Sequence, residues 1–317
     1  MPGLPFLVAI IGPTAVGKTE LSLSLAERLG AEIISVDSRQ VYRKLDIGTA
    51  KATEEERARV PHHLIDVADP VERFSASRFV ELSTRAIEEI LARRKSVLLV
   101  GGTPFYYRAL LCGTLTEDLG SDPGIRAHLE KILAREGKAA MHERLRSVDE
   151  DSARRIHPND AVRIVRALEI HTLTGRPASE VFRTRSPLCY PARVLYIGLS
   201  RSREEIRKRI ADRALVQFEE GFPEEVASLL EEGIDERYPS MQGLGYRELA
   251  AFHRGRISLE SALEGYITAT RAFARRQMTW FTKFEPAVWY DMTRSEGESL
   301  QGDILMKIEE NQRGGRS

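Results

Sequence analysis

The chain has 317 residues, and its 47 lysines and arginines balance its 47 aspartates and glutamates, so no global basicity indicates a nucleic-acid partner. Any nucleic-acid site must therefore be a local basic patch. This length accommodates about two domains, or one domain with a large insertion. The two cysteines, Cys112 and Cys189, lie far apart without a Cys-x-x-Cys or Cys/His cluster. That pattern argues against a disulfide framework or a structural zinc site and predicts two buried, reduced thiols.

The N-terminal apolar run, residues 4–11, has no basic segment before it and continues directly into a glycine-rich loop. It therefore predicts a first strand, Phe6–Ile11, rather than a signal peptide. No run approaches the length needed to cross a bilayer. We expect a soluble, cytoplasmic protein that does not bind membranes.

The glycine-rich loop has the spacing Gly-x4-Gly-Lys-Thr, which is typical of a phosphate-binding loop. Its two glycines allow the backbone to turn its N–H groups inward, and the lysine adds a point charge. The apolar spacing of residues 21–29 predicts a helix after the loop, whose N-terminus adds a dipole. The predicted phosphate-binding residues are Gly12, Pro13, Thr14, Ala15, Val16, Gly17, Lys18 and Thr19. The loop does not specify which phosphorylated compound it holds, and a glycine-rich turn next to a helix remains the alternative.

Strand and helix patterns alternate through the first hundred residues. Short apolar runs predict strands at residues 32–36, 63–67 and 97–100, and helical spacing predicts a helix at residues 75–93. This alternation predicts an α/β fold, a parallel sheet flanked by helices like that of P-loop NTPases. Ligands are then expected at the carboxyl ends of the strands.

From about residue 119 the pattern changes to short helical segments, and no strand is predicted again before residues 193–199. We interpret residues 119–188 as an all-helical subdomain inserted into the α/β core, which comprises residues 1–118 and 189–317. The insertion contains 13 lysines and arginines against 10 aspartates and glutamates, a small local excess of positive charge.

The C-terminal part of the chain is predicted to be largely helical. A loop is expected at residues 243–246, a long helical region at 259–284, a closing strand at 287–290 and a last helix at 300–308. The tail, residues 311–317, is expected to be disordered.

Asp37 is the one carboxylate at a predicted strand end near the phosphate loop. The strand at 97–100 ends in Gly-Gly-Thr103, where an ordinary P-loop ATPase places an acid for Mg²⁺. This sparse set, with Thr19 for Mg²⁺, suits a transferase better than a motor: Asp37 would deprotonate an acceptor and Thr103 would hydrogen-bond the leaving oxygens. The alternatives are a turn cap or outer-sphere Mg²⁺ partner for Asp37 and a helix N-cap for Thr103.

Two clusters of basic residues are candidates for anion binding, because arginine matches phosphate geometry well. The first contains Arg154, Arg155, His157, Arg163 and Arg166, and the second contains Arg207, Lys208, Arg209 and Arg213. Arg163 and Arg166 are three residues apart, so one helix face can present both. His62 and His63 would point to opposite faces of an extended segment, which argues against a two-histidine metal site.

Taken together, these motifs resemble those of the tRNA dimethylallyltransferases, also called isopentenyl-diphosphate:tRNA transferases. The similar segments cover nearly the whole chain: residues 12–19, 37–43, 46–51, 61–66, 101–103, 157–160, 163–169, 245–248 and 275–281. Many families share the phosphate loop, but the segments at 37–51 and 61–66 are specific. The sequence lacks the C-terminal Cys/His set of the eukaryotic relatives, so the bacterial type is the better match. Ala52, Pro104 and Phe105 depart from the family pattern, and Phe105 could reshape the substrate tunnel.

The resemblance implies that the loop binds the diphosphate of dimethylallyl diphosphate, with Mg²⁺, and that the acceptor is the N6 amine of the adenosine 3′ to a tRNA anticodon. Asp37 would be the base, while Thr103 and Arg213 would help to stabilise the departing diphosphate. The implied contacts to the anticodon stem-loop are Asp37, Ser38, Arg39, Gln40, Thr103, Arg126, Val162, Arg163, Ile164, Val165, Arg166, Gln242, Gly243, Leu244, Gly245, Tyr246 and Arg247. The helical insertion would belong to this RNA site. The oligomeric state is open, with a monomer favoured.

Three other functions remain as alternatives. An enzyme that prenylates free adenine nucleotides would share the loop and the chemistry of Asp37. A kinase of a small metabolite would use the same loop for ATP, with Asp37 as the base for a hydroxyl. An RNA-binding module with a relic phosphate loop would need no catalytic Asp37.

Overall fold

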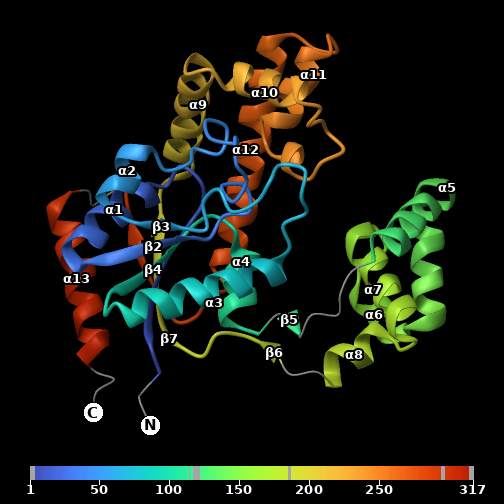
Figure 1. Ribbon diagram of the computed structural model, residues 1–317, viewed down its shortest axis with the longest axis horizontal. Coiled ribbons are helices and arrows are strands. Elements are labelled where there is room, and N and C mark those ends of the chain that lie inside the picture. The colour runs from blue at the N-terminus through green and yellow to red at the C-terminus, as the bar shows by residue number, and fades with distance from the viewer. Residues whose placement is uncertain (1–3, 114, 117–121, 185–186, 294–296, 314–317) are drawn as a thin grey trace. The chain divides into compact units, whose positions relative to one another are not determined.

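The computed structural model describes residues 4–113, 115–116, 122–184, 187–293 and 297–313 (Figure 1). The chain divides into two compact units. The first comprises Met1–Cys112 and Tyr190–Ser317, and the second comprises Gly113–Cys189. The helical insertion predicted at residues 119–188 falls within the second unit.

The first unit is built on a six-stranded sheet in the order β3-β2-β4-β1-β7-β8, in which every neighbouring pair is parallel. Its strands are β1 (Phe6–Ile11), β2 (Ala31–Ser35), β3 (His62–His63), β4 (Ser96–Val100), β7 (Arg193–Ser200) and β8 (Ala287–Asp291). In the central strand, Val8 pairs with Leu98 on one side and Leu195 on the other. All but the first residue of β1 are buried, as expected for a strand that is covered on both faces. The predicted parallel α/β fold is confirmed.

The helices of this unit are α1 (Lys18–Leu29), α2 (Glu54–Arg59), α3 (Ala76–Ala92), α4 (Pro104–Leu111), α9 (Arg203–Glu219), α10 (Phe222–Glu231), α11 (Tyr246–His253), α12 (Leu259–Phe281) and α13 (Glu298–Arg313), with a short 3₁₀ helix η1 (Ser240–Gln242). The side chains of Val8 and Ile10 share one core with α1 and α13. From α4, the Tyr107 hydroxyl lies 3.0 Å from the carbonyl oxygen of Ile10, and the Tyr107 ring packs edge-on against Phe281 of α12.

A second apolar core is formed by helices α9, α10, α11 and α12 together with the loop that follows β2. Phe222 is its centre, because its ring packs against those of Tyr246 and Tyr266. A Cβ at Gly48 would lie 2.2 Å from the Phe222 ring, so only glycine allows this loop to approach. Figure 1 shows α9, α10 and α11 gathered at one end of this unit. This core fixes the loop that carries residues 37–51.

The second unit consists of α5 (Pro123–Val148), α6 (Glu150–Arg155), α7 (Ala161–Thr174) and α8 (Ala178–Thr184), with a short antiparallel pair of β5 (Leu115–Thr116) and β6 (Pro187–Leu188). Helix α5 is interrupted at Gly137, whose φ is 81°. Apolar residues of α5 and α7, among them Leu145 and Ile164, form the core of this unit. Strand β6 contradicts the prediction that no strand lies between about residue 119 and residue 193, since two-residue strands leave no periodic pattern in a sequence.

Three local predictions are wrong. The third strand ends at His63, because Leu64 and Asp66 have φ values of 62° and 57°, which an extended strand excludes. Both cysteines are exposed rather than buried. They flank the junctions between the two units, where neither core encloses them. Helix α13 continues to Arg313, so the predicted disorder fails for 311–313, and residues 314–317 lie outside the described part. Among the described helices, none is long and apolar enough to span a membrane.

Candidate active site

The predicted phosphate-binding loop, residues 12–19, lies at the carboxyl end of β1, where the sequence places it. A Cβ at Gly12, whose φ is 150°, would lie 2.7 Å from the carbonyl oxygen of Leu199, so a side chain there would displace β7. Gly17 has a φ of 106° and leads directly into α1 at Lys18. The loop therefore presents the N-terminus of α1 toward its ligand space.

The Lys18 ammonium group is turned into the loop. Its Nζ donates to the carbonyl oxygens of Gly12 and Pro13 at 2.9 and 2.8 Å. Burial lowers the pKa of Lys18 to about 7, the charge of Asp37 opposes this decrease, and the charge of Arg213 adds to it. An anion in the loop would favour the charged ammonium.

Three arginines on or just before α9 contact the loop from the side of β7. Arg201 and Arg209 donate through Nε to the carbonyl oxygens of Val16 and Ala15, at 2.9 and 2.8 Å. Arg213 donates through Nη2 to the Thr14 hydroxyl at 2.8 Å. The structure thus brings Arg213 to the loop, as the sequence suggests. Arg201 was missed, and its only signal was its position directly after a strand.

One oxygen of Asp37 caps a turn, and the other makes no hydrogen bond within the described residues. Oδ1 accepts from the backbone N–H groups of Arg39 and Gln40 at 2.8 and 3.3 Å. Oδ2 faces Gly102, at 3.8 Å from where a Cβ of that residue would lie. The turn-cap interpretation therefore holds for Oδ1, while Oδ2 is available to a ligand.

Thr103 occupies the N-cap position of α4, but its side chain caps nothing there. Instead its hydroxyl oxygen accepts from the backbone N–H of Ser38 at 3.1 Å. Its own N–H donates to the carbonyl oxygen of Val36 at 3.2 Å. The Gly-Gly-Thr segment is thereby fixed against the turn that carries Asp37.

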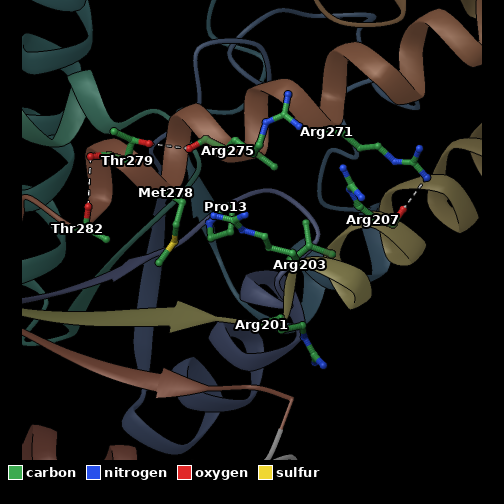
Figure 2. A pocket seen from close by; sticks show the side chains of 11 residues that line it. Pro13, Arg201, Arg203, Arg207, Arg271, Arg275, Met278, Thr279 and Thr282 are labelled. Atoms are coloured by element: carbon green, nitrogen blue, oxygen red, sulfur yellow. Dashed lines mark hydrogen bonds between the residues drawn. The ribbon is translucent and has the colours of Figure 1, made fainter.

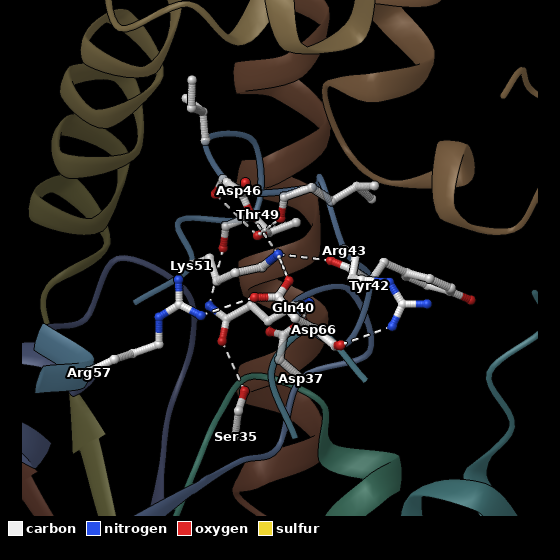
Figure 3. A network of polar contacts seen from close by, with 12 residues as sticks. Ser35, Asp37, Gln40, Tyr42, Arg43, Asp46, Thr49, Lys51, Arg57 and Asp66 are labelled. Carbon is white, nitrogen blue, oxygen red and sulfur yellow. Dashed lines mark hydrogen bonds and ion pairs between the residues drawn. The ribbon is translucent and has the colours of Figure 1, made fainter. Parts of the chain in front are cut away.

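Figure 3 shows the polar network behind this turn. The Gln40 carboxamide accepts from the Ser35 hydroxyl at 2.9 Å and donates to the carbonyl oxygens of Ala50 and Thr49 at 3.0 and 3.3 Å. Both ends of the amide are therefore occupied by protein atoms. In this arrangement Gln40 supports the turn, and its implied contact with the anticodon stem-loop would require its side chain to change partners.

Lys51 is the centre of the same network. Its ammonium group, with only 2% of the side chain exposed, donates to the Tyr42 carbonyl oxygen at 2.8 Å and pairs with Asp46 and Asp66 at 2.5 and 2.6 Å. Arg57 pairs with the second oxygen of Asp66 at 3.0 Å. These contacts hold the loop at residues 42–51 against Asp66. Sequence reasoning gave Lys51 no role, although it lies in a segment that carried the resemblance.

A cavity of about 540 Å³ adjoins the loop at Pro13 (Figure 2). Its remaining walls come from α9, α12 and residues beside them, and five of its lining residues are arginines: Arg201, Arg203, Arg207, Arg271 and Arg275. Ile206, Ala274 and Met278 add an apolar surface. Guanidinium groups next to hydrocarbon suit an anion with a short apolar tail.

The described residues contain no group of three or more His, Cys, Asp or Glu side chains that could hold a metal ion. A divalent ion would therefore depend largely on the oxygens of a bound phosphate. Thr19 fits such an arrangement, because its side chain is exposed at the start of α1 and its hydroxyl has no hydrogen-bond partner in the described part of the chain. Mg²⁺ bound through one protein oxygen, phosphate oxygens and water is chemically ordinary.

In the second unit, Glu169 forms ion pairs with two of the arginines that are predicted to contact RNA, Arg126 and Arg166. The completely buried carboxylate accepts from Arg126 at 2.5 Å and from Arg166 at 2.8 Å. Burial opposes its ionisation, but the hydrogen bonds from Arg166 and Arg126, together with their charges, outweigh burial and hold the pKa of Glu169 below its ordinary value. Glu169 therefore orients both guanidinium groups.

The N-terminus of α7 divides into exposed and buried residues. The side chain of Arg163 is 62% exposed, and Val162 is 81% exposed. Ile164 and Val165 are buried in the core of the unit, so their side chains are closed to a partner. Of these predicted contacts, Val162 and Arg163 lie on the surface.

The predicted segment 242–247 belongs to the first unit. Tyr246 is buried and donates to Glu225 at 2.6 Å, while Gly245 donates its N–H to Glu248 at 2.8 Å. Gln242 donates to the carbonyl oxygen of Glu236. Arg247 keeps 58% of its side chain exposed and pairs with Glu248 at 2.9 Å. Arg39 also reaches this region, since its guanidinium donates to the carbonyl oxygen of Pro239.

Comparison with known proteins gives a consistent result. The profile of the family described as IPP transferase matches residues 40–284. The chain belongs to this family. It is 44% identical over 288 residues to the tRNA dimethylallyltransferase of Thermomicrobium roseum, covering 91% of this chain and 87% of that protein. It is 46% identical over 285 residues to that of Geobacter metallireducens, covering 90% and 92%.

Solved structures of IPP transferase relatives agree. The full-length tRNA isopentenylpyrophosphate transferase of Bacillus halodurans matches with a TM-score of 0.72 and 39% identity, covering 98% of this chain and 99% of that one. A eukaryotic dimethylallyltransferase, whose structure was solved in the course of its action on tRNA, matches with a TM-score of 0.78 and 30% identity, covering 91% and 74%. The resemblance stated from the motifs is confirmed.

The Glu169 ion pairs predict a pH-dependent stability of the second unit. Because the pKa of Glu169 is lowered on folding, its stabilisation is complete above the ordinary pKa and is lost as the pH falls through the lowered value. We expect Glu169→Gln to lower the free energy of unfolding by about 1–3 kcal/mol at pH 7 and by less in acid. Urea unfolding of the full chain followed by far-UV circular dichroism measures this.

Both tryptophans, Trp280 and Trp289, lie in the first unit, so their fluorescence records that unit separately. A variant whose destabilisation stays the same from pH 7 down to acid would contradict the ionic role of Glu169.

Proposed function

We propose that this chain transfers a dimethylallyl group from dimethylallyl diphosphate to the N6 amine of the adenosine 3′ to the anticodon of tRNAs, releasing diphosphate. The observation that carries the proposal is the free Oδ2 of Asp37, which lies beside the Gly-Gly-Thr segment and near enough to the phosphate loop to influence Lys18 electrostatically. A base and a diphosphate cradle in one site are what this transfer requires. Membership of the IPP transferase family supports the same reaction.

Asp37 would supply the base. The adenine N6 lone pair is delocalised into the ring, so the amine becomes an effective nucleophile only as its proton leaves. Asp37 is suited to receive that proton, because Oδ1 is fixed by two backbone N–H groups while Oδ2 remains free. The C–O bond to the diphosphate breaks as the C–N bond to the adenine forms.

The departing diphosphate would be stabilised by the loop and its neighbours. Lys18 and the N-terminus of α1 supply positive potential, and Arg213 reaches Thr14 at the edge of the loop. Thr103 would hydrogen-bond a leaving oxygen. Mg²⁺, held through Thr19 and the diphosphate, would neutralise further charge when bound. The arginine-lined cavity would admit the diphosphate, with its apolar wall formed by Ile206, Ala274 and Met278 against the five-carbon chain.

The acceptor adenine must leave its stack to reach the half-buried Asp37, so recognition requires a splayed single-stranded loop. The exposed Arg163 and Val162 of the second unit and Arg247 of the first are proposed to hold the anticodon stem-loop. Arg126 and Arg166 would join them once phosphates compete with Glu169. Because tRNA is the acceptor, we place the reaction in the cytoplasm.

The direct test is incubation with Mg²⁺, dimethylallyl diphosphate and either unmodified tRNA or AMP, followed by mass analysis of the nucleosides. We expect one five-carbon addition to a tRNA adenosine and none to AMP. Addition to AMP alone would instead identify a nucleotide prenyltransferase. Addition to neither, with turnover of ATP, would identify a kinase.

Asp37→Asn keeps the shape of the turn but removes the base. We expect the single-turnover rate of prenyl transfer to fall about 100-fold or more, while the affinity for tRNA stays nearly constant. Asp303→Asn, at an exposed position of α13, is the matched control. Equal single-turnover rates for wild type and Asp37→Asn would remove Asp37 from the mechanism and would favour a binding module.

Arg163→Ala removes an exposed cation from the N-terminus of α7. If Arg163 contacts a phosphate, tRNA affinity should fall severalfold and the slope of log K against log salt should decrease by about 1. Arg135→Ala, at another exposed arginine of the second unit, on α5, is the control. An unchanged affinity across the salt series would exclude Arg163 from the tRNA site.

A further inference from the structure

Gln277 of α12 is buried, with 2% of its surface exposed, and its carboxamide joins two loops that are far apart in the sequence. Oε1 accepts from the backbone N–H of Thr14 in the phosphate loop at 2.8 Å. Nε2 donates to the carbonyl oxygen of Gly102, in the Gly-Gly-Thr segment, at 2.6 Å. A single side chain therefore spans the diphosphate cradle and the segment beside Asp37.

The backbone around Gln277 is shaped for this contact. A Cβ at Gly102 would lie 2.6 Å from Gln277 Nε2, so a side chain at position 102 would displace the amide. A Cβ at Gly101 would lie 2.1 Å from the carbonyl oxygen of Val36, which holds this segment against the end of β2. The bridge is consequently tight on both sides.

The contacts continue without a break to the proposed base. Gly102 leads to Thr103, whose hydroxyl oxygen accepts from the N–H of Ser38, the residue after Asp37. At the other end, the hydroxyl of Thr14 accepts from Arg213 of α9. Thr14 is thus fixed by α12 through its N–H and by α9 through its side chain, and the Asp37 turn is fixed relative to both.

We propose that Gln277 is a positioning residue that sets the distance between the leaving diphosphate and the adenine amine. This inference rests on the proposed prenyl transfer. Gln277 need not touch either substrate, because it fixes the two loops that hold them. A shift of about 1 Å between reacting groups can lower a rate about 100-fold. If the two Gln277 hydrogen bonds are removed, the adenine amine is no longer aligned with the allylic carbon, while the diphosphate remains bound by Lys18 and Arg213.

A misaligned allylic carbon has water as its alternative acceptor. In that step the C–O bond to diphosphate breaks, a new C–O bond forms to a water oxygen, and the water proton passes to solvent. The products are dimethylallyl alcohol and diphosphate. The ratio of diphosphate released to adenosine prenylated therefore reports alignment, and a general loss of folding or affinity would leave that ratio unchanged.

The test compares Gln277→Met, which removes both hydrogen bonds at similar length, with Gln277→Asn, which keeps the amide but is too short to span both loops. We expect single-turnover prenyl transfer to fall about ten- to 100-fold in both. Dimethylallyl diphosphate should bind with nearly wild-type affinity, and the ratio of diphosphate to prenylated adenosine should rise above one. Rapid quenching with separate assays of both products measures this.

Gln301→Met is the matched control, since Gln301 accepts from Ser24 and so joins α13 to α1 away from the site. The proposal would be overturned if both Gln277 variants transferred the prenyl group at the wild-type rate with one diphosphate released per adenosine prenylated. It would also be overturned if the transfer rate fell only as much as the affinity for dimethylallyl diphosphate, with that ratio still at one. If the wild-type chain itself failed to prenylate tRNA, the proposed function would fail instead, so the two failures are distinguishable. Trp280 and Trp289 fluorescence would identify a variant that does not fold.

Discussion

The phosphate loop depends on donors that other elements direct at its carbonyl oxygens. A turn that points its N–H groups inward leaves its C=O groups facing the protein, where each needs a partner. Lys18 takes two of these oxygens, and Arg201 and Arg209 take two more from the side of β7. The loop is thus fixed before a ligand binds, and the electrostatic cost of gathering these cations is offset when an anion arrives.

Because the loop needs these partners, the site is built from segments that are far apart in the sequence of the first unit. The parallel sheet brings the ends of β1, β2, β4 and β7 to one edge, and each strand leads into a loop of the site. Helix α12 then crosses these loops and carries Gln277 between them. Glu225 of α10 adds support by accepting from the N–H groups of Asp46 and Ile47. A change at a residue distant in the sequence can therefore shift the Asp37 turn or the phosphate loop.

The sequence predicted most of the features that follow from a periodic pattern or a short local motif. The loop at 12–19, the alternation of strands and helices, and the placement of Asp37 and Thr103 at strand ends follow from short-range patterns. Gln277 and Lys51 were not predicted, because their roles depend on partners distant in the chain or on loops whose φ values no pattern reveals. The two exposed cysteines were misjudged for a similar reason, since burial at a junction between units depends on tertiary structure.

The cavity beside Pro13 bears on the choice between a prenyl diphosphate and a nucleoside triphosphate. Both ligands would satisfy the loop and the surrounding arginines, so charge alone does not distinguish them. The two ligands differ in the group that is attached to the phosphates. Ile206, Ala274 and Met278 offer hydrocarbon next to the arginines. The hydroxyl groups of a ribose placed there would lose their hydrogen bonds to water, which is unfavourable unless protein groups replace them. The transfer of a five-carbon chain from water to this surface is favourable. This wall would therefore suit a prenyl chain, whereas a ribose would need hydrogen bonds from Thr279, Thr282 or the arginines of the same cavity.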